Sequence, residues 1–120
     1  MKLSEIIEIV SAIVINEGKG TSIEIVSVCG TDMMSDALRY AIKDAMLITS
    51  LNQPQVIRTA EIVDIPAVLV VLGKPIPYDM ANLAKEKNIA LISTKYSLFT
   101  SCGILYQHGI RSCLEHQSDR

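Results

Sequence analysis

The stretch AMLITSLNQPQVIRTAEIVDIPAVLVV, residues 45–71, decides the fold. It begins and ends with a short apolar run, at residues 45–49 and 67–71. Between the two runs, apolar residues recur at the spacing of one helix face: Val56, Ile57, Ala60 and Val63. Pro54 stands near the first position of this helix, where its missing N–H costs nothing. A strand–helix–strand unit of this kind builds two parallel strands joined by a right-handed crossover.

The same unit recurs along the chain. Four apolar runs start 22 residues apart, at Ile23, Ala45, Ala67 and Ile89. Each is followed by a small or polar break and then by a helical stretch. We therefore expect a single α/β domain of three layers, with a mainly parallel sheet and helices on both faces. Residues 12–15 predict one further brief strand. The Gly-x-Gly at residues 18–20 opens no helix, so it predicts a hairpin or crossover turn rather than a phosphate loop.

Length and composition indicate one folded domain. At 120 residues, 49% of them hydrophobic, the chain is long enough for a single core. We expect the domain to span residues 1–110 and residues 111–120 to form a polar, unpatterned tail. A net charge of −2, with one Phe and no Trp, argues against both a duplex binder and a stacking platform for single strands. The sequence thus predicts no nucleic-acid partner.

Cysteine usage and hydropathy predict a cytoplasmic location and no membrane partner. Three cysteines without a close pair are typical of reduced thiols and do not indicate a metal site. The spacing of Cys113 and His116 is easily accidental. The longest fully apolar stretch, residues 65–72, is too short to span a bilayer. Glu5 and Glu8 interrupt the apolar amino-terminal segment, which is unlike a signal peptide.

Polar and positively charged side chains follow the four phased strands. Because the carboxyl ends of parallel strands meet at one edge of a sheet, we expect these segments to converge there. The residues are Cys29, Gly30, Thr31, Asp32, Asn52, Gln53, Gly73, Lys74, Thr94, Lys95 and Tyr96. Two lysines beside helix amino ends favour a phosphate or carboxylate ligand. The alternative is that these residues are solvated loop positions and helix caps, with Asp32 and Asn52 as caps.

No set of residues amounts to a catalytic signature. Neither His108 nor His116 stands in a recognisable context for nucleophilic catalysis. The chain also has no P-loop. We predict no catalytic residue and no cofactor, and we interpret the cysteines as buried, inert thiols. Cys29 and Cys102 could face each other across the sheet edge or a subunit interface. A small transferase or hydrolase that uses Asp32 or Cys29 is the least favoured alternative.

Three segments resemble the DRTGG domain family. They are CGTDMMSDALRYA (29–41), LITSLNQPQVIRTAEIVDIPAVLVVLGKPIP (47–77) and NIALISTKYSLFTSCGIL (88–105), and the resemblance covers residues 23–110. The family's fold is similar to the amino-terminal domain of HPr kinase/phosphorylase. Its members accompany CBS domains and phosphotransacetylases as regulatory or ligand-sensing modules, often as dimers. Small stand-alone versions occur in anaerobic bacteria, some of them near iron-hydrogenase genes.

The chain departs from the residues that give the family its name. Asn52 and Gln53 stand where the family has Asp-Arg, and residues 72–74, Leu-Gly-Lys, stand where it has Thr-Gly-Gly. Lys74 shifts the expected ligand preference toward anions.

The resemblance implies a non-enzymatic regulatory or ligand-sensing module that works as a homodimer. It would bind a small anionic ligand, phosphorylated or nucleotide-like, or a partner protein, through the loops after the parallel strands. The alternative is an assembly subunit of an anaerobic redox system, associated with a hydrogenase, that binds a partner protein and no small molecule.

Overall fold

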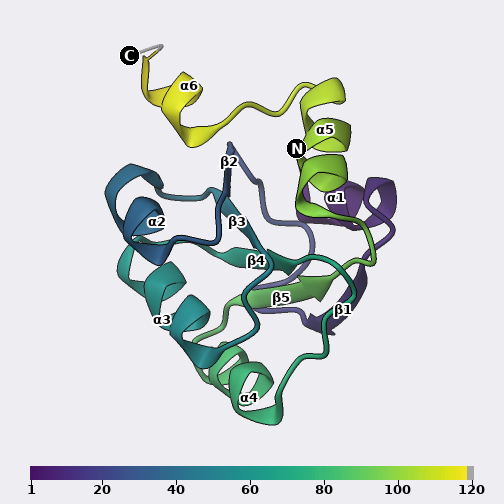
Figure 1. Cartoon of the computed structure of the whole chain (residues 1–120), viewed down its shortest axis with the longest axis vertical. Helices are drawn as coiled ribbons and strands as arrows, with labels where there is room; N and C mark the ends of the chain where they lie inside the picture. Colours follow the sequence, from purple (N-terminus) through teal and green to yellow (C-terminus); the bar gives the residue numbers. More distant parts are fainter. Residues whose placement is uncertain (119–120) are drawn as a thin grey trace.

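The computed structural model describes residues 1–118, and the side chains of residues 1–115. Its core is a five-stranded sheet in the order β1-β5-β4-β3-β2 (Figure 1). The strands are β1 (Ile13–Asn16), β2 (Val28–Gly30), β3 (Met46–Thr49), β4 (Ala67–Val70) and β5 (Ala90–Ser93). Strands β2 to β5 are parallel to their neighbours, whereas β1 runs antiparallel to β5. The predicted mainly parallel sheet is confirmed.

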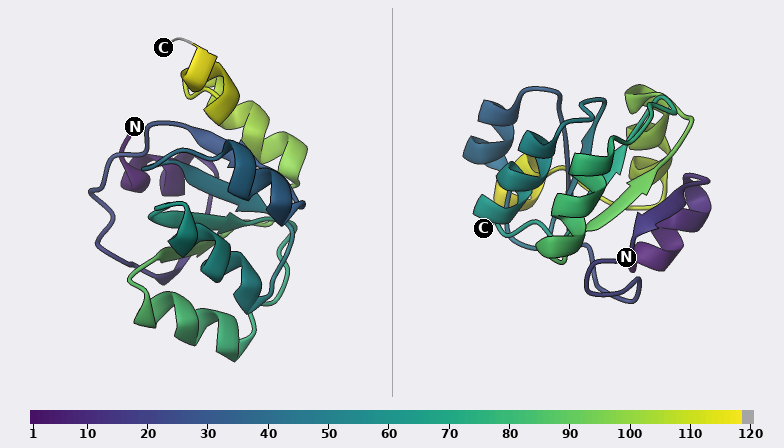
Figure 2. Two further views of the ribbon diagram at one scale, coloured as in Figure 1. Left: turned by 90° about the vertical axis from the view of Figure 1, so that its left-hand side faces the viewer. Right: turned by 90° about the horizontal axis from the view of Figure 1, so that it is seen from below.

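Helices cover both faces of this sheet (Figure 2). One face carries α2 (Met34–Tyr40), α3 (Pro54–Ile62) and α4 (Tyr78–Glu86), and the other carries α1 (Leu3–Ile9) and α5 (Leu98–Gln107). Alternate strand residues face opposite layers, so that Leu47 packs with the first group and Met46 with the second. Every residue of β3, β4 and β5 is buried as a result. The three-layer α/β fold is confirmed.

The first phased strand enters the sheet later than predicted, at Val28 rather than Ile23. The Leu3 N–H donates to the Ile23 carbonyl at 3.0 Å, and the Ile25 N–H donates to the Met1 carbonyl at 2.8 Å. Residues 23–25 are thus paired with the start of the chain, and their apolar side chains fill the core beneath α1. The apolar pattern of residues 23–25 indicates that these side chains are buried. It does not indicate which segment of backbone forms the hydrogen bonds with these residues.

The segment after β1 is a crossover and not a hairpin, because β1 and β2 lie at opposite edges of the sheet. Its Gly18 lies against the amino end of β5 with φ of +59°. A Cβ at this position would stand 2.4 Å from the Ala90 nitrogen, closer than any side chain allows. The Asn16 side chain ties the same segment down by donating to the Ile89 carbonyl at 2.9 Å. Gly18 is therefore required for backbone packing.

The carboxyl-terminal segment differs from the unpatterned tail that the sequence predicts. Cys113–Ser118 form a helix, α6, and the Val28 N–H donates to the Arg111 carbonyl at 3.1 Å. The Cys113 side chain is 2% exposed and packs into the core beside α2. Over residues 111–115, whose side chains are described, Cys113 is the one buried residue, and this is too little buried apolar content to make a periodic pattern. The domain boundary at residue 110 stays a prediction.

Candidate functional site

The loops after β4 and β5 run side by side at the carboxyl edge of the sheet. The Leu72 N–H donates to the Tyr96 carbonyl and the Gly73 N–H donates to the Thr94 carbonyl, both at 2.8 Å. Leu72 and Gly73 both adopt positive φ, +66° and +59°, and this turn brings the two loops together. The two predicted lysines, Lys74 and Lys95, therefore line one cavity of about 620 Å³.

We call this cavity the carboxyl-edge pocket. It is lined by Ser11, Ile13, Ile15, Gly73, Lys74, Pro75, Ile76, Ser93, Thr94, Lys95 and Tyr96. Ile13, Ile15 and Ile76 form an apolar wall, and the lysines supply the only charges among these residues. Neither lysine forms an ion pair within the part of the chain whose side chains are described. The pocket thus combines an apolar surface with two positive charges and no carboxylate in its lining.

Thr94 is a buried residue of the pocket lining that makes two hydrogen bonds through its hydroxyl. Its hydroxyl donates to the Val10 carbonyl at 2.7 Å and accepts the Tyr96 N–H at 3.2 Å. The Tyr96 hydroxyl in turn lies 3.5 Å from the hydroxyl of Ser11, another residue that lines the pocket. Thr94 is buried, and its hydroxyl is already used both as a donor and as an acceptor. It therefore positions Tyr96 and Lys95 and does not present a free hydroxyl to a ligand.

Asp32 ties the loop after β2 to the end of β3. Its carboxylate accepts the Thr49 hydroxyl at 2.9 Å, the Ser50 N–H at 2.7 Å and the Ser50 hydroxyl at 2.6 Å. Partial burial acts to raise the pKa of Asp32, but these hydrogen bonds and the charge of Lys74 outweigh it and lower the pKa. The Asp32 side chain is therefore an ionised carboxylate occupied by hydrogen-bond donors, and it is not suited to act as a general acid. It is also not a helix cap, since α2 has no side-chain cap.

Asn52 and Gln53 flank the pocket without lining it. The Asn52 amide donates to the Pro75 carbonyl at 2.8 Å and so braces the loop that carries Lys74. Gln53, and not Asn52, is the residue before α3, and its side chain makes no capping bond. The expected Asn52 cap is wrong because the side chain finds a partner on the neighbouring loop. Pro54 stands at the start of α3 as predicted.

The remaining predicted residues, Cys29, Gly30 and Thr31, lie in a separate cavity of about 260 Å³. It is formed with α2 and α6 and contains neither lysine. A hydrogen bond with Cys113, followed by burial, raises the pKa of the Cys29 thiol well above its usual range. Burial also raises the pKa of Cys102. The thiols of Cys29 and Cys102 are therefore held protonated, the unreactive form of cysteine.

Cys29 and Cys102 do not face each other across the sheet edge within one chain, and the alternative of a subunit interface stays a prediction. Cys29 is hydrogen-bonded to Cys113, whereas Cys102 packs with the core on the opposite face of the sheet. Over the described residues, no three His, Cys, Asp or Glu side chains gather as metal ligands would. The side chain of His116, considered with Cys113 above, lies outside those described.

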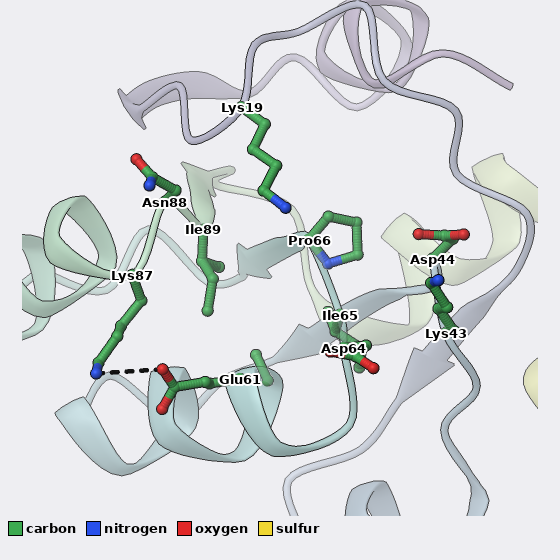
Figure 3. A pocket seen from close by; sticks show the side chains of 11 residues that line it. Lys19, Lys43, Asp44, Glu61, Asp64, Ile65, Pro66, Lys87, Asn88 and Ile89 are labelled. Carbon is green, nitrogen blue, oxygen red and sulfur yellow. Dashed lines mark ion pairs between the residues drawn. The ribbon is translucent and has the colours of Figure 1, made fainter.

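Sequence reasoning missed a pocket of about 310 Å³ at the opposite edge of the sheet (Figure 3). We call it the amino-edge pocket. Its charged lining residues are Lys19, Lys43, Lys87, Asp44, Glu61 and Asp64. Positive and negative groups are equal in number, and the Lys87 ammonium pairs with the Glu61 carboxylate at 3.2 Å. Asp44, Asp64 and Asn88 have positive φ and turn the chain from each helix into the next strand. The signal in the sequence that could have found these residues is the polar residue at each helix end that precedes a strand.

Among the described helices, none has the length and apolar character needed to cross a bilayer. No curated protein matches the chain. Among solved structures, the chain is similar to the CBS and DRTGG domains of the regulatory region of Clostridium perfringens pyrophosphatase, complexed with the activator diadenosine tetraphosphate.

That likeness has a TM-score of 0.71 at 19% identity and covers 86% of this chain and 45% of the other, so it concerns the fold. The family model of the DRTGG domain matches residues 5–108, which include every strand of the sheet. The chain belongs to the DRTGG domain family.

Proposed function

We propose that this domain is a non-enzymatic, homodimeric regulatory module of the cytoplasm that senses a small anionic ligand in the carboxyl-edge pocket. The observation that carries the proposal is the meeting of Lys74 and Lys95 at one cavity with no carboxylate in its lining. Cations near helix amino ends are unfavourable for the protein itself. Lys74 precedes α4 and Lys95 precedes α5, so a bound anion would relieve both charges.

The shape of the pocket supports an anion that also has an apolar part. Its volume of about 620 Å³ falls within the range of small-molecule sites. The lysines suit phosphate groups, and the wall of Ile13, Ile15 and Ile76 suits a base or a similar flat apolar group. A nucleotide has both parts. The relative from Clostridium perfringens, complexed with a dinucleoside tetraphosphate, supports the same ligand class.

The state of the other polar groups supports binding rather than catalysis. The Asp32 carboxylate is occupied by donors from Thr49 and Ser50. The Cys29 thiol is held protonated and lies in the other cavity. A nucleophile needs a base within hydrogen-bonding reach, and neither group has one in the described contacts.

The second candidate function is an assembly subunit of a redox enzyme complex. Exposed apolar residues on an edge strand favour it, because the Ile13 side chain of β1 is 64% exposed. This function requires a partner protein and predicts no affinity for small anions.

A thermal-shift series separates the two functions. The chain would be heated with diadenosine tetraphosphate, ATP, tripolyphosphate or adenosine, and compared with the Lys74→Ala/Lys95→Ala variant. At about 100-fold its Kd, a ligand adds about 2.7 kcal/mol, which raises Tm by about 10 °C for a domain of this size. We expect the phosphorylated compounds to stabilise the wild type and not the variant. Equal shifts in both proteins, or none in either, would overturn the proposal.

A further inference from the structure

Helix α5 presents a second apolar stripe to solvent. Its inward stripe is Leu98, Ser101 and Leu105, which pack toward the sheet. On the outward side, Phe99, Gly103 and Tyr106 follow one another at helical spacing. The Phe99 side chain is 89% exposed and that of Tyr106 is 54% exposed. A helix that is apolar on both sides is normally covered on both sides.

The stripe has a depression between its two aromatic residues. A Cβ added at Gly103 would meet nothing within 4 Å, so another backbone or side chain could approach the helix there. The depression belongs to an open groove of about 870 Å³ that runs along α5. Helix α5 lies at the periphery of the molecule (Figures 1 and 2). The surface therefore offers projecting rings next to a hollow that could receive a ring.

The charge of the stripe indicates what covers it. The ten residues Leu98–Gln107 contain no charged side chain. Outside the helix, the Arg111 guanidinium stacks on the Tyr106 ring at 4.1 Å from its centroid, at the far end of the stripe from Phe99. A second copy of the helix could therefore dock over Phe99 and Gly103 without burying a charged side chain of α5. In a twofold pair, each copy offers both the projecting ring and the hollow, so the contact is made twice.

We propose that α5 is the homodimer interface, with Phe99 of one copy packed over Gly103 of the other. This inference rests on the homodimer of the proposed function and not on its ligand. Aromatic side chains bury about 150–250 Å² each, so two per copy give about 600–1,000 Å², which is the size of a weak, transient interface. The dimer therefore dissociates at micromolar concentrations.

Sedimentation of the full chain in a reducing buffer, from about 1 to 500 µM, tests the interface. Phe99→Glu and Gly103→Leu should each raise the dimer Kd by about tenfold or more. Leu in place of Gly also favours the helix, so Gly103→Leu should fold at least as stably as the wild type while it dimerises less. The control is Ile62→Glu, since Ile62 is 69% exposed on α3 at the opposite face of the sheet.

Each outcome decides the proposal. A concentration-dependent dimer that the two α5 variants weaken and Ile62→Glu does not weaken supports it. A wild-type dimer that ignores both α5 variants overturns the interface but keeps the homodimer, which then forms elsewhere, for instance through β1. A wild-type monomer at every concentration overturns both, and a different protein must cover the stripe. Loss of anion binding in the thermal-shift series would leave this inference intact.

Discussion

The two edges of the sheet both carry lysines on short loops, yet they differ in what surrounds those lysines. At the amino edge, Lys19, Lys43 and Lys87 face as many carboxylates and the carboxyl ends of helices, which attract cations. At the carboxyl edge, Lys74 and Lys95 line a pocket that contains no carboxylate, and they stand before helix amino ends, although Lys74 also attracts the nearby Asp32. The first arrangement serves the stability of the protein, whereas the second gains most from an external anion. The presence of lysines does not by itself identify a ligand site. What distinguishes the two edges is whether carboxylates and helix carboxyl ends balance the lysine charges.

The largest expected difference between the edges concerns two glycines with the same φ of +59°. Gly18 packs on the backbone of Ala90, whereas Gly73 has the Lys95 side chain as its nearest neighbour at 3.5 Å. Gly18→Ala should lower the free energy of unfolding by about 3 kcal/mol or more, because backbone must move. Gly73→Ala should cost about 1 kcal/mol, the backbone strain alone. Urea unfolding of both variants would measure this, and equal losses would contradict the close packing at the amino edge.

A smaller difference is expected for one aspartate at each edge. Asp32→Asn removes a carboxylate that accepts three hydrogen bonds and should cost about 1 kcal/mol at pH 7. Asp64→Asn is the matched control, because Asn also tolerates positive φ.

The effect of Asp32 should depend on pH. Its pKa is lowered in the folded state, so its stabilisation is present above the unfolded value of 3.8 and is lost as pH falls through the folded pKa. The difference in the free energy of unfolding between the wild type and Asp32→Asn, measured by urea unfolding, should therefore shrink toward pH 2. If the difference in the free energy of unfolding between the two proteins stayed constant from pH 7 to pH 2, the stabilisation would not depend on the charge of Asp32.

The smallest expected effect concerns the direction in which the stability changes when one of two lysines is replaced by alanine. Lys87→Ala breaks an exposed ion pair with Glu61 and should lower the stability of the ligand-free protein by about 0.5 kcal/mol or less. Lys74→Ala removes a cation that stands before a helix amino end and whose attraction to Asp32 is the smallest of the causes that lower the pKa of that carboxyl, so the stability should stay unchanged or rise slightly. Differential scanning calorimetry at low salt resolves the sign. A clear loss of stability on Lys74→Ala would show that the attraction between Lys74 and Asp32 outweighs the repulsion between Lys74 and the helix amino end.

The sequence predicted the sheet because its strands are continuous apolar runs of β-branched residues, as at residues 67–71. It also predicted that Lys74 and Lys95 would lie near each other, since both follow parallel neighbours in that sheet. It could not predict that Asp32 and Asn52 would bind loops instead of capping helices, because that choice depends on which donor or acceptor lies across the edge. Residues 29–31 were placed at the right edge, but α2 and α6 separate them into another cavity.

The central claim is that an anion binds between Lys74 and Lys95, and calorimetric titration with diadenosine tetraphosphate tests it most directly. Three proteins would be compared: the wild type, Lys74→Ala/Lys95→Ala, and Lys19→Ala/Lys43→Ala, which removes as much charge from the amino edge. We expect the carboxyl-edge variant to raise the Kd by about tenfold or more and the amino-edge variant to change it by about twofold or less. Equal weakening in both variants would reduce the interaction to general charge attraction, and undiminished binding by the carboxyl-edge variant would contradict the proposed site.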